Sequence, residues 1–207
     1  MAAAALGAYV LYMALAFALR TAIQLRRTGS SGFEGISGRP GSAEWLAGVL
    51  FVVAVAAGLV APLLALLGIV EPIGALDTTA AHVAGIVLFA AGLAGTLAAQ
   101  IAMGESWRIG VDDATATELV TGGPFALVRN PVFAAMLPVS AGLALMVPSV
   151  ATFAGLAAFV VALELQVRVV EEPYLRRVHG ARYASYASRV GRFLPGIGRL
   201  RSRLTSE

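Results

Sequence analysis

Long apolar runs separated by short polar or glycine-rich stretches dominate the hydropathy pattern of the chain. Each run is long enough, or nearly so, to cross a bilayer core of roughly 30 Å as a helix. The runs cover residues 1–25, 45–70, 79–103, 131–147 and 150–170. Because a spanning helix satisfies its own backbone hydrogen bonds, the pattern predicts an all-α, polytopic integral membrane protein with about five transmembrane helices.

The runs also suggest how the chain is organised. We expect a single membrane domain over residues 1–207. Its predicted parts are three N-terminal spans (1–103), a polar interfacial segment (104–130), a helical hairpin (131–170) and a cytoplasmic helical tail (171–207). The run at 1–25 is predicted to be a span and not a cleaved signal peptide, since its basic residues follow the apolar stretch.

Small residues mark one face of the third run. They are Gly85, Ala91, Gly92, Gly95 and Thr96. Membrane helices approach each other closely where such residues line the contact, so this face is predicted to pack against another span.

Arginine placement predicts the orientation in the membrane. The turns at 71–78 and 148–149 contain no arginine, whereas the loop at 26–44, the segment at 104–130 and the tail all contain several. Cytoplasmic loops carry the excess of basic residues. The N-terminus is therefore expected outside and the C-terminus in the cytoplasm, most simply in a bacterial inner membrane.

Composition restricts the catalytic groups and partners that the chain can use. Hydrophobic residues make up 58% of the 207 residues and charged residues 13%, about half the charge of a typical soluble domain. Cysteine and lysine are absent, which excludes thiolate and Schiff-base catalysis. The two histidines, His82 and His179, are far apart in the sequence, so no metal site is expected. The small positive charge follows the topology and does not indicate a nucleic-acid partner.

One short stretch, residues 122–133, is typical of a helix entrance. Asn130 is a favourable N-cap and Pro131 a favourable first helical residue. Free amides at a helix N-terminus bind anions, and the preceding Arg129 adds a guanidinium suited to a carboxylate or phosphate. The alternative is a Gly-Pro turn followed by a purely structural cap.

Acidic residues line one stripe at the end of the last span. Glu164, Arg168, Glu171 and Glu172 share a helical face. A carboxylate inside an apolar segment is a functional candidate, although Glu164 could instead form a structural ion pair and Glu171 and Glu172 could be solvated boundary residues. Together with Arg129, these groups would suit a zwitterionic ligand.

Several short motifs in the C-terminal part of the chain occur in the order and spacing of a known family. The chain resembles the isoprenylcysteine carboxyl methyltransferase and phospholipid methyltransferase superfamily over roughly residues 119–196. The matching residues are Gly123, Pro124, Phe125, Arg129, Asn130, Pro131, Val132, Phe133, Glu171, Glu172, Leu175, Gly180, Tyr183, Tyr186, Val190, Arg192 and Pro195.

The resemblance implies an S-adenosylmethionine-dependent membrane methyltransferase with a lipophilic acceptor drawn from the bilayer. It assigns cofactor binding to Gly123, Pro124, Arg129, Asn130, Pro131, Phe133, Glu171, Glu172, Tyr183, Tyr186 and Arg192. Trp107 and Arg108, just before the core motif, are predicted to contact the acceptor; the alternative is an interfacial anchor.

Two departures from the family pattern limit the chemistry. Asn130 stands where the family often has His, and Phe133 where it often has Tyr. Asn cannot act as a base near neutral pH. A carboxylate or thiolate acceptor needs no base, whereas an amine or hydroxyl could use Glu164 or Glu172. The catalytic candidates are therefore Arg129, Glu164 and Glu172.

Two other functions fit the same residues. A membrane reductase of the sterol type has a similar tail and uses NADPH, and a non-catalytic protein could keep the same fold. Arg20 and Gln24, near the end of the first span, are expected to snorkel or pack and not to bind ligand.

Overall fold

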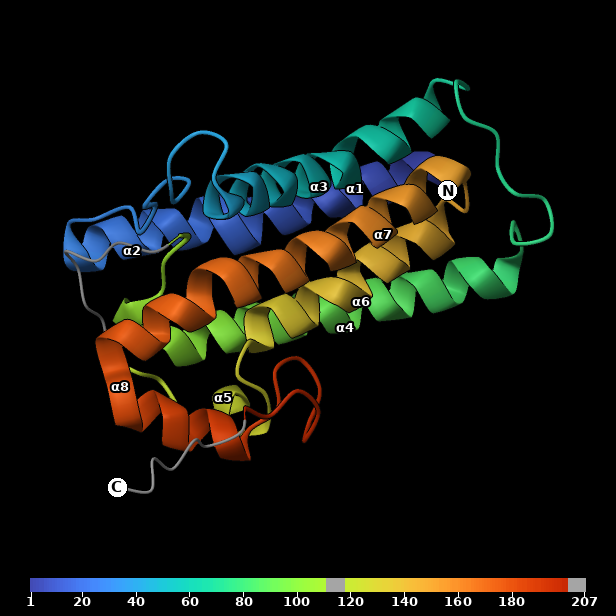
Figure 1. The fold of residues 1–207 in the computed structure, drawn as a ribbon. Helices are drawn as coiled ribbons and strands as arrows, with labels where there is room; N and C mark the ends of the chain where they lie inside the picture. The colour runs from blue at the N-terminus through green and yellow to red at the C-terminus, as the bar shows by residue number, and fades with distance from the viewer. Residues whose placement is uncertain (111–117, 201–207) are drawn as a thin grey trace.

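The computed structural model describes residues 1–110 and 118–200 and shows a bundle of apolar helices lying side by side (Figure 1). The interfacial segment and the tail extend past these ranges, so the parts of those predictions at 111–117 and 201–207 lie outside the described residues. Within the described residues the chain forms helices and no strand.

Five long helical units make up the bundle. The first joins α1 (Ala2–Met13), the π-helical η1 (Ala14–Leu19) and α2 (Arg20–Thr28). The next two are α3 (Ala43–Leu66) and α4 (Thr79–Met103), which ends in the short η2 (Gly104–Ser106). The short α5 (Pro124–Leu127) precedes α6 (Pro131–Met146). The last unit joins α7 (Val150–Leu165), the π-helical η3 (Gln166–Glu171) and α8 (Glu172–Arg189).

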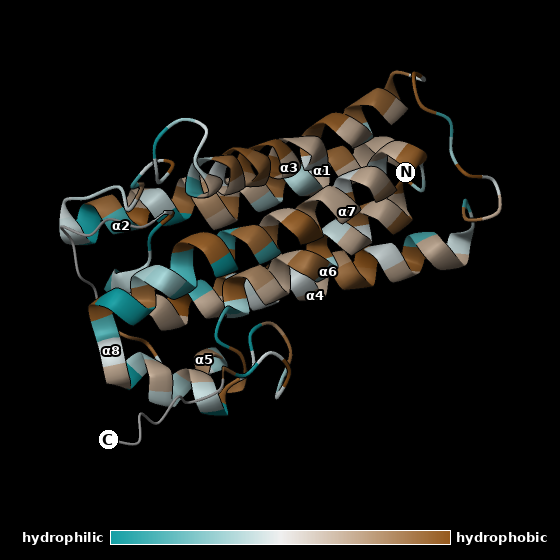
Figure 2. Ribbon diagram, viewed as in Figure 1, coloured by the Kyte–Doolittle hydropathy of each residue, from teal (hydrophilic) through white to brown (hydrophobic). Residues whose placement is uncertain are grey.

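Length and composition confirm the predicted class of membrane protein. Four of these helical units are long and apolar enough to cross a bilayer, and α6 is a shorter apolar helix. Large apolar side chains such as Val53, Val87 and Val161 are exposed on the outside of the bundle. Hydrophobic residues predominate along most of the bundle (Figure 2). Burying this surface in lipid is favourable, whereas water would leave it hydrated.

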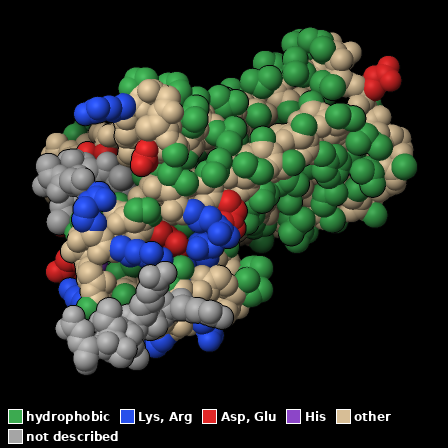
Figure 3. Space-filling view, viewed as in Figure 1, with side chains coloured by type: hydrophobic (Ala, Val, Ile, Leu, Met, Phe, Trp, Pro, Cys, Tyr) green, Lys and Arg blue, Asp and Glu red, His purple; other side chains and the backbone are tan. Residues whose placement is uncertain are grey.

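The connections fall at two ends of the bundle (Figure 1). The N-terminus, the turn after α3 and the turn between α6 and α7 lie at one end. The loop after α2, the segment after α4, α5 and α8 lie at the other, which we call the polar end. Arginine and acidic side chains gather there (Figure 3).

The α4–α6 contact confirms the small-residue face. A Cβ on Gly85 would lie 2.7 Å from the carbonyl oxygen of Gly142, and one on Gly92 would lie 2.7 Å from the backbone nitrogen of Val139. Only glycine permits backbones to approach this closely. Ala91 is exposed, so its assignment to this face is wrong.

A sharp bend in α8 sets the position of the tail. The apolar part of the last unit, residues 150–170, runs along the bundle, and α8 leaves it at the polar end (Figure 1). Inside α8, Gly180 has φ 49° and ψ −123°, which only glycine adopts readily. The bend turns residues 181–189 back beneath α5. The tail thereby closes over the polar end of the bundle.

Candidate functional site

A pocket opens at the polar end of the bundle. It encloses about 910 Å³ of space not occupied by atoms, including its open mouth. Three stretches far apart in the sequence form its walls: 103–110 after α4, 118–133 around α5 and the start of α6, and 171–186 in the last helix. Of the predicted site residues, it is lined by Trp107, Arg108, Arg129, Asn130, Pro131, Phe133, Glu171, Tyr183 and Tyr186.

The first turn of α6 forms one wall, but Asn130 does not cap it as predicted. Asn130 occupies the N-cap position, yet its side chain makes no hydrogen bond to the helix. Its Nδ2 instead donates to the carbonyl oxygen of Arg192, 3.2 Å away. The returning tail supplies an acceptor that the local sequence does not reveal. The amides of the first turn, which have no intrahelical partner, therefore lack a side-chain cap from Asn130 and adjoin the pocket.

Phe133 connects this wall to the core. Its ring lies 5.7 Å from the ring of Phe51, which in turn lies 6.1 Å from that of Phe159. The helix start is therefore held by aromatic packing on α3 and α7.

A buried charge cluster fastens the tail to the α6 entrance. Arg129 Nη2 donates to Glu172 Oε1 over 2.6 Å. Arg192 donates to the same carboxylate through Nε (2.8 Å) and Nη2 (3.1 Å). Arg129 also donates to the carbonyl oxygens of Ala187 and Val190. All three charged side chains are buried.

Backbone pairing reinforces this cluster. The amide of Arg129 donates to the carbonyl oxygen of Gly191 over 2.8 Å, and that of Asn130 to Arg192 over 3.1 Å. Arg129 was expected to offer its guanidinium to a ligand, whereas its partners here are protein groups. Its Nε has no hydrogen-bond partner among the described residues and is itself fully buried.

Glu172 is unsuited to accept a proton. Burial alone would raise the pKa of its carboxyl, but hydrogen bonds from Arg192 and Arg129 outweigh burial and hold that pKa below its ordinary value. Two guanidiniums occupy its oxygens, and Glu172 does not line the pocket. Its geometry fits a role in holding Arg129 and Arg192 in place.

Glu171, the adjacent residue, lines the pocket. Burial raises the pKa of the Glu171 carboxyl to about 7; the Arg108 guanidinium opposes this shift and the Glu172 carboxylate adds to it. A carboxyl group that changes charge near neutral pH within a pocket is typical of functional sites.

Trp107 and Arg108 belong to the stretch after α4 that forms another wall of the pocket. Trp107 is buried, and the guanidinium of Arg20 lies 5.0 Å from the centre of its ring. The guanidinium of Arg108 lies 4.8 Å from the ring of Tyr174. Both predicted acceptor residues therefore line the same pocket as Arg129 and Glu171.

Tyr183 and Tyr186 close the pocket from α8. Both are buried, with ring centres 6.3 Å apart. The Tyr186 hydroxyl donates to the carbonyl oxygen of Phe125 over 2.6 Å. Gly123 and Pro124 do not line the pocket themselves. They start α5, which places Phe125 in the wall.

Two other candidates lie outside the lining. Glu164 is partly exposed and paired with Arg168 one turn later. Glu164 also lies near Arg192, whose Nη1 is 3.9 Å away. Neither the Glu164 nor the Arg192 side chain borders the pocket, so the structure separates them from Glu171.

Sequence reasoning missed several lining residues. They include Met103, Ser106, Glu118, Leu119, Val120 and Tyr174. Tyr174 could have been found, since it lies one helical turn after Glu171 on the same face. The residues at 118–120 carry no local signal, because only the fold brings them to the pocket.

Comparison of the sequence with models of known protein families gives a match. Residues 80–182 match the model of the phospholipid methyltransferase family. The chain belongs to this family. No curated protein matches it. The family is part of the membrane methyltransferase superfamily that the motifs resembled, which confirms that prediction. The protein is thus a member of a family of integral membrane methyltransferases.

The family match and the pocket coincide in large part. The match starts in α4 and ends in α8, and it includes the wall residues from Met103 to Leu175. Tyr183, Tyr186 and Arg192 lie beyond it, as do α1, α2 and the loop that follows them.

Proposed function

We propose that the protein transfers a methyl group from S-adenosylmethionine to a lipophilic acceptor within the membrane. The observation that carries this proposal is the pocket at the polar end of a methyltransferase-family bundle, where the start of α6, Glu171 and the aromatic wall of α8 meet.

The lining fits such a cofactor. S-adenosylmethionine presents a carboxylate, an ammonium, ribose hydroxyls and an adenine ring, and its sulfonium supplies an electrophilic methyl group. The first-turn amides of α6, next to the positive charge of Arg129, would hold an anionic group. Glu171 would pair with the ammonium. Phe125 and Tyr186 offer aromatic surface for a ring.

Glu172 and Arg192 act through Arg129 in this account. Their ion pairs fix the Arg129 guanidinium beside the helix start, so its positive charge is already in place before ligand binds. Orientation of two reactants, without proton transfer, supplies much of the rate of a methyl transfer.

The acceptor would approach along the wall of Trp107 and Arg108. Met103, Leu119 and Leu175 make this part of the pocket apolar. A lipid, a quinone or a prenylated carboxylate all meet that description. Glu118 and Glu171 both line the pocket, so with Glu171 paired to the cofactor, Glu118 would be the carboxyl placed to take a proton from an amine acceptor, in place of Glu164 and Glu172.

We further propose that the polar end faces the cytoplasm. The two turns at the opposite end contain no arginine, and cytoplasmic segments carry the excess of basic residues. Soluble S-adenosylmethionine would then enter directly from the cell interior. A bacterial inner membrane is the most direct setting.

Cofactor binding separates this proposal from the alternatives. Purified protein in nanodiscs is titrated calorimetrically with S-adenosylhomocysteine and, separately, with NADPH. Binding of S-adenosylhomocysteine alone is expected. Binding of NADPH alone would support the sterol-type reductase, and binding of neither would support a non-catalytic member of the family.

A further inference from the structure

The first helical unit carries a polar face that ends at the pocket wall. Arg20 and Gln24, one turn apart, are buried although they lie near the end of a membrane span. Arg20 Nη2 donates to the carbonyl oxygen of Gly104, and Gln24 Nε2 donates to that of Glu105 over 2.8 Å. These two side chains therefore hold successive carbonyls of the turn that leads to Trp107.

Charge complements these contacts. Gly104 follows the last residue of α4, where the helix dipole places partial negative charge. The guanidinium of Arg20 neutralises that end and also lies 5.0 Å from the centre of the Trp107 ring. One side chain thus fixes both the backbone turn and the indole.

The loop after α2 supports the same wall. The amide of Ile109 donates to the carbonyl oxygen of Gly32 over 2.7 Å, and the amide of Glu34 donates to that of Ile109 over 2.9 Å. A Cβ on Gly32 would lie 3.2 Å from atoms of the Trp107 ring. The ring is therefore enclosed between Arg20 and Gly32.

Deeper in the membrane, η1 continues this face. The π-helical turn changes the local hydrogen-bond pattern, and the carbonyl oxygen of Ala16 accepts from Gln100 Nε2 over 2.8 Å. Gln100 belongs to α4. The first helical unit therefore contacts α4 at two places, through η1 at Gln100 and through α2 at the C-terminal end of α4.

We infer that Arg20 and Gln24 are positioning residues that set the acceptor wall of the pocket through Trp107. This inference rests on the proposed function for the role of that wall. Arg20 and Gln24 contact the turn before Trp107 and do not line the pocket themselves, so they would adjust acceptor recognition and leave the part of the pocket assigned to the cofactor unchanged.

Trp107 itself supplies the readout. The chain has two tryptophans, so Trp45→Phe leaves Trp107 as the single emitter. In this background we compare Arg20→Met, Arg20→Lys and Gln24→Leu. The control is Arg27→Met, which removes an exposed arginine from the same helix.

Arg20→Met and Gln24→Leu are expected to shift Trp107 emission to longer wavelength and to increase its quenching by acrylamide. Arg20→Lys, which keeps the charge and loses the planar group, is expected to fall between them and the control. With a phospholipid extract as the acceptor probe, the half-saturating lipid concentration should rise by about 2- to 30-fold, the factor that a cation–π contact contributes to an equilibrium. Affinity for S-adenosylhomocysteine should stay as in the control.

The inference is overturned if all three variants leave the emission wavelength and the acrylamide quenching of Trp107 unchanged. If Arg20→Met does not fold, the milder Arg20→Lys and Gln24→Leu still decide it. If the protein transfers no methyl group at all, the proposed function fails, but the fluorescence comparison still tests whether these residues position Trp107.

Discussion

Glu171 and Glu172 are neighbours in the sequence with opposite surroundings. Adjacent helical residues point in directions about 100° apart. Glu172 points to Arg129 and Arg192, and Glu171 borders the pocket. The pKa of the Glu172 carboxyl is lowered, whereas that of Glu171 is raised to about 7. Hence Glu172 supports the positions of Arg129 and Arg192, and we propose that Glu171 contacts the ligand.

The proposed role of Glu171 predicts that cofactor affinity depends on pH. A bound ammonium favours the ionised carboxylate, so affinity should rise as the pH increases through about 7 and level off above it. Below that pH, protonation competes with binding. Glu171→Gln should weaken S-adenosylhomocysteine binding by about 10- to 100-fold at pH 8, the range for a hydrogen bond to a charged group. It should also remove this pH dependence, as measured by calorimetry from pH 5.5 to 8.5.

The matched control is Glu105→Gln, because Glu105 is an exposed carboxylate at the same end of the bundle that does not line the pocket. It should keep both the affinity and the pH profile. An unchanged profile in Glu171→Gln would place the titrating group elsewhere.

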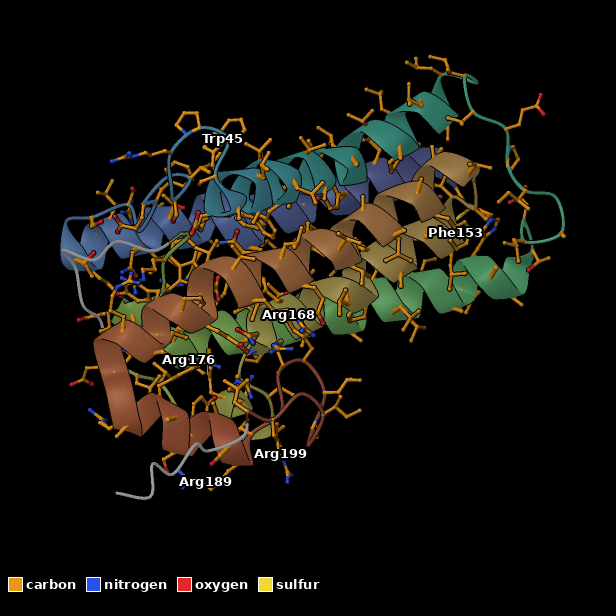
Figure 4. All side chains as sticks on the ribbon, in the orientation of Figure 1. Trp45, Phe153, Arg168, Arg176, Arg189 and Arg199 are labelled. Atoms are coloured by element: carbon orange, nitrogen blue, oxygen red, sulfur yellow. The ribbon has the colours of Figure 1, made fainter. Side chains whose placement is uncertain are left out.

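At the scale of elements, the bend in α8 decides whether the pocket closes. Residues before Gly180 include Glu171 and Tyr174, and residues after it include Tyr183 and Tyr186. A straight helix would direct the second pair away from α5. The arginines labelled along and after α8, such as Arg176, Arg189 and Arg199, lie at this end of the molecule (Figure 4).

Gly180→Ala should destabilise this closure. The φ of 49° is strained for any residue with a Cβ, which costs about 1–3 kcal/mol. We expect a lower melting temperature and weaker S-adenosylhomocysteine binding. Gly155→Ala is the control, since Gly155 lies inside α7 and its added Cβ would make an ordinary contact at 3.6 Å. Equal melting temperatures for the two variants would show that the bend is unimportant.

Elements that depend on local composition could be predicted from the sequence. The third span was predicted at 79–103, and α4 has the same bounds. Its small-residue face follows from a periodic pattern, with Ala91 as the exception. Features that depend on the returning tail could not be predicted. Asn130 was expected to cap its own helix, but its acceptor is Arg192, 62 positions away. The contrast between Glu171 and Glu172 has the same origin.

For the whole molecule, the bundle has one arginine-free end and one arginine-rich end. The absence of cysteine allows the orientation to be tested with single substitutions. Ala75→Cys lies in the exposed turn after α3, and Ala184→Cys is exposed on α8. In intact cells a membrane-impermeant maleimide should label Ala75→Cys alone, and lysis should make Ala184→Cys reactive. The reverse pattern would place the pocket outside the cell.

The most direct measurement of the central claim is transfer of a labelled methyl group. Membranes containing the protein are incubated with S-adenosylmethionine labelled in its methyl group and then extracted into organic solvent. The account predicts label in the lipid extract of the wild type, little label with Glu171→Gln, and wild-type label with Glu105→Gln. The acceptors are supplied in turn as total phospholipid, quinone and prenylated carboxylate. The account is contradicted if, with all three, the wild-type extract contains no more label than the extract of membranes lacking the protein.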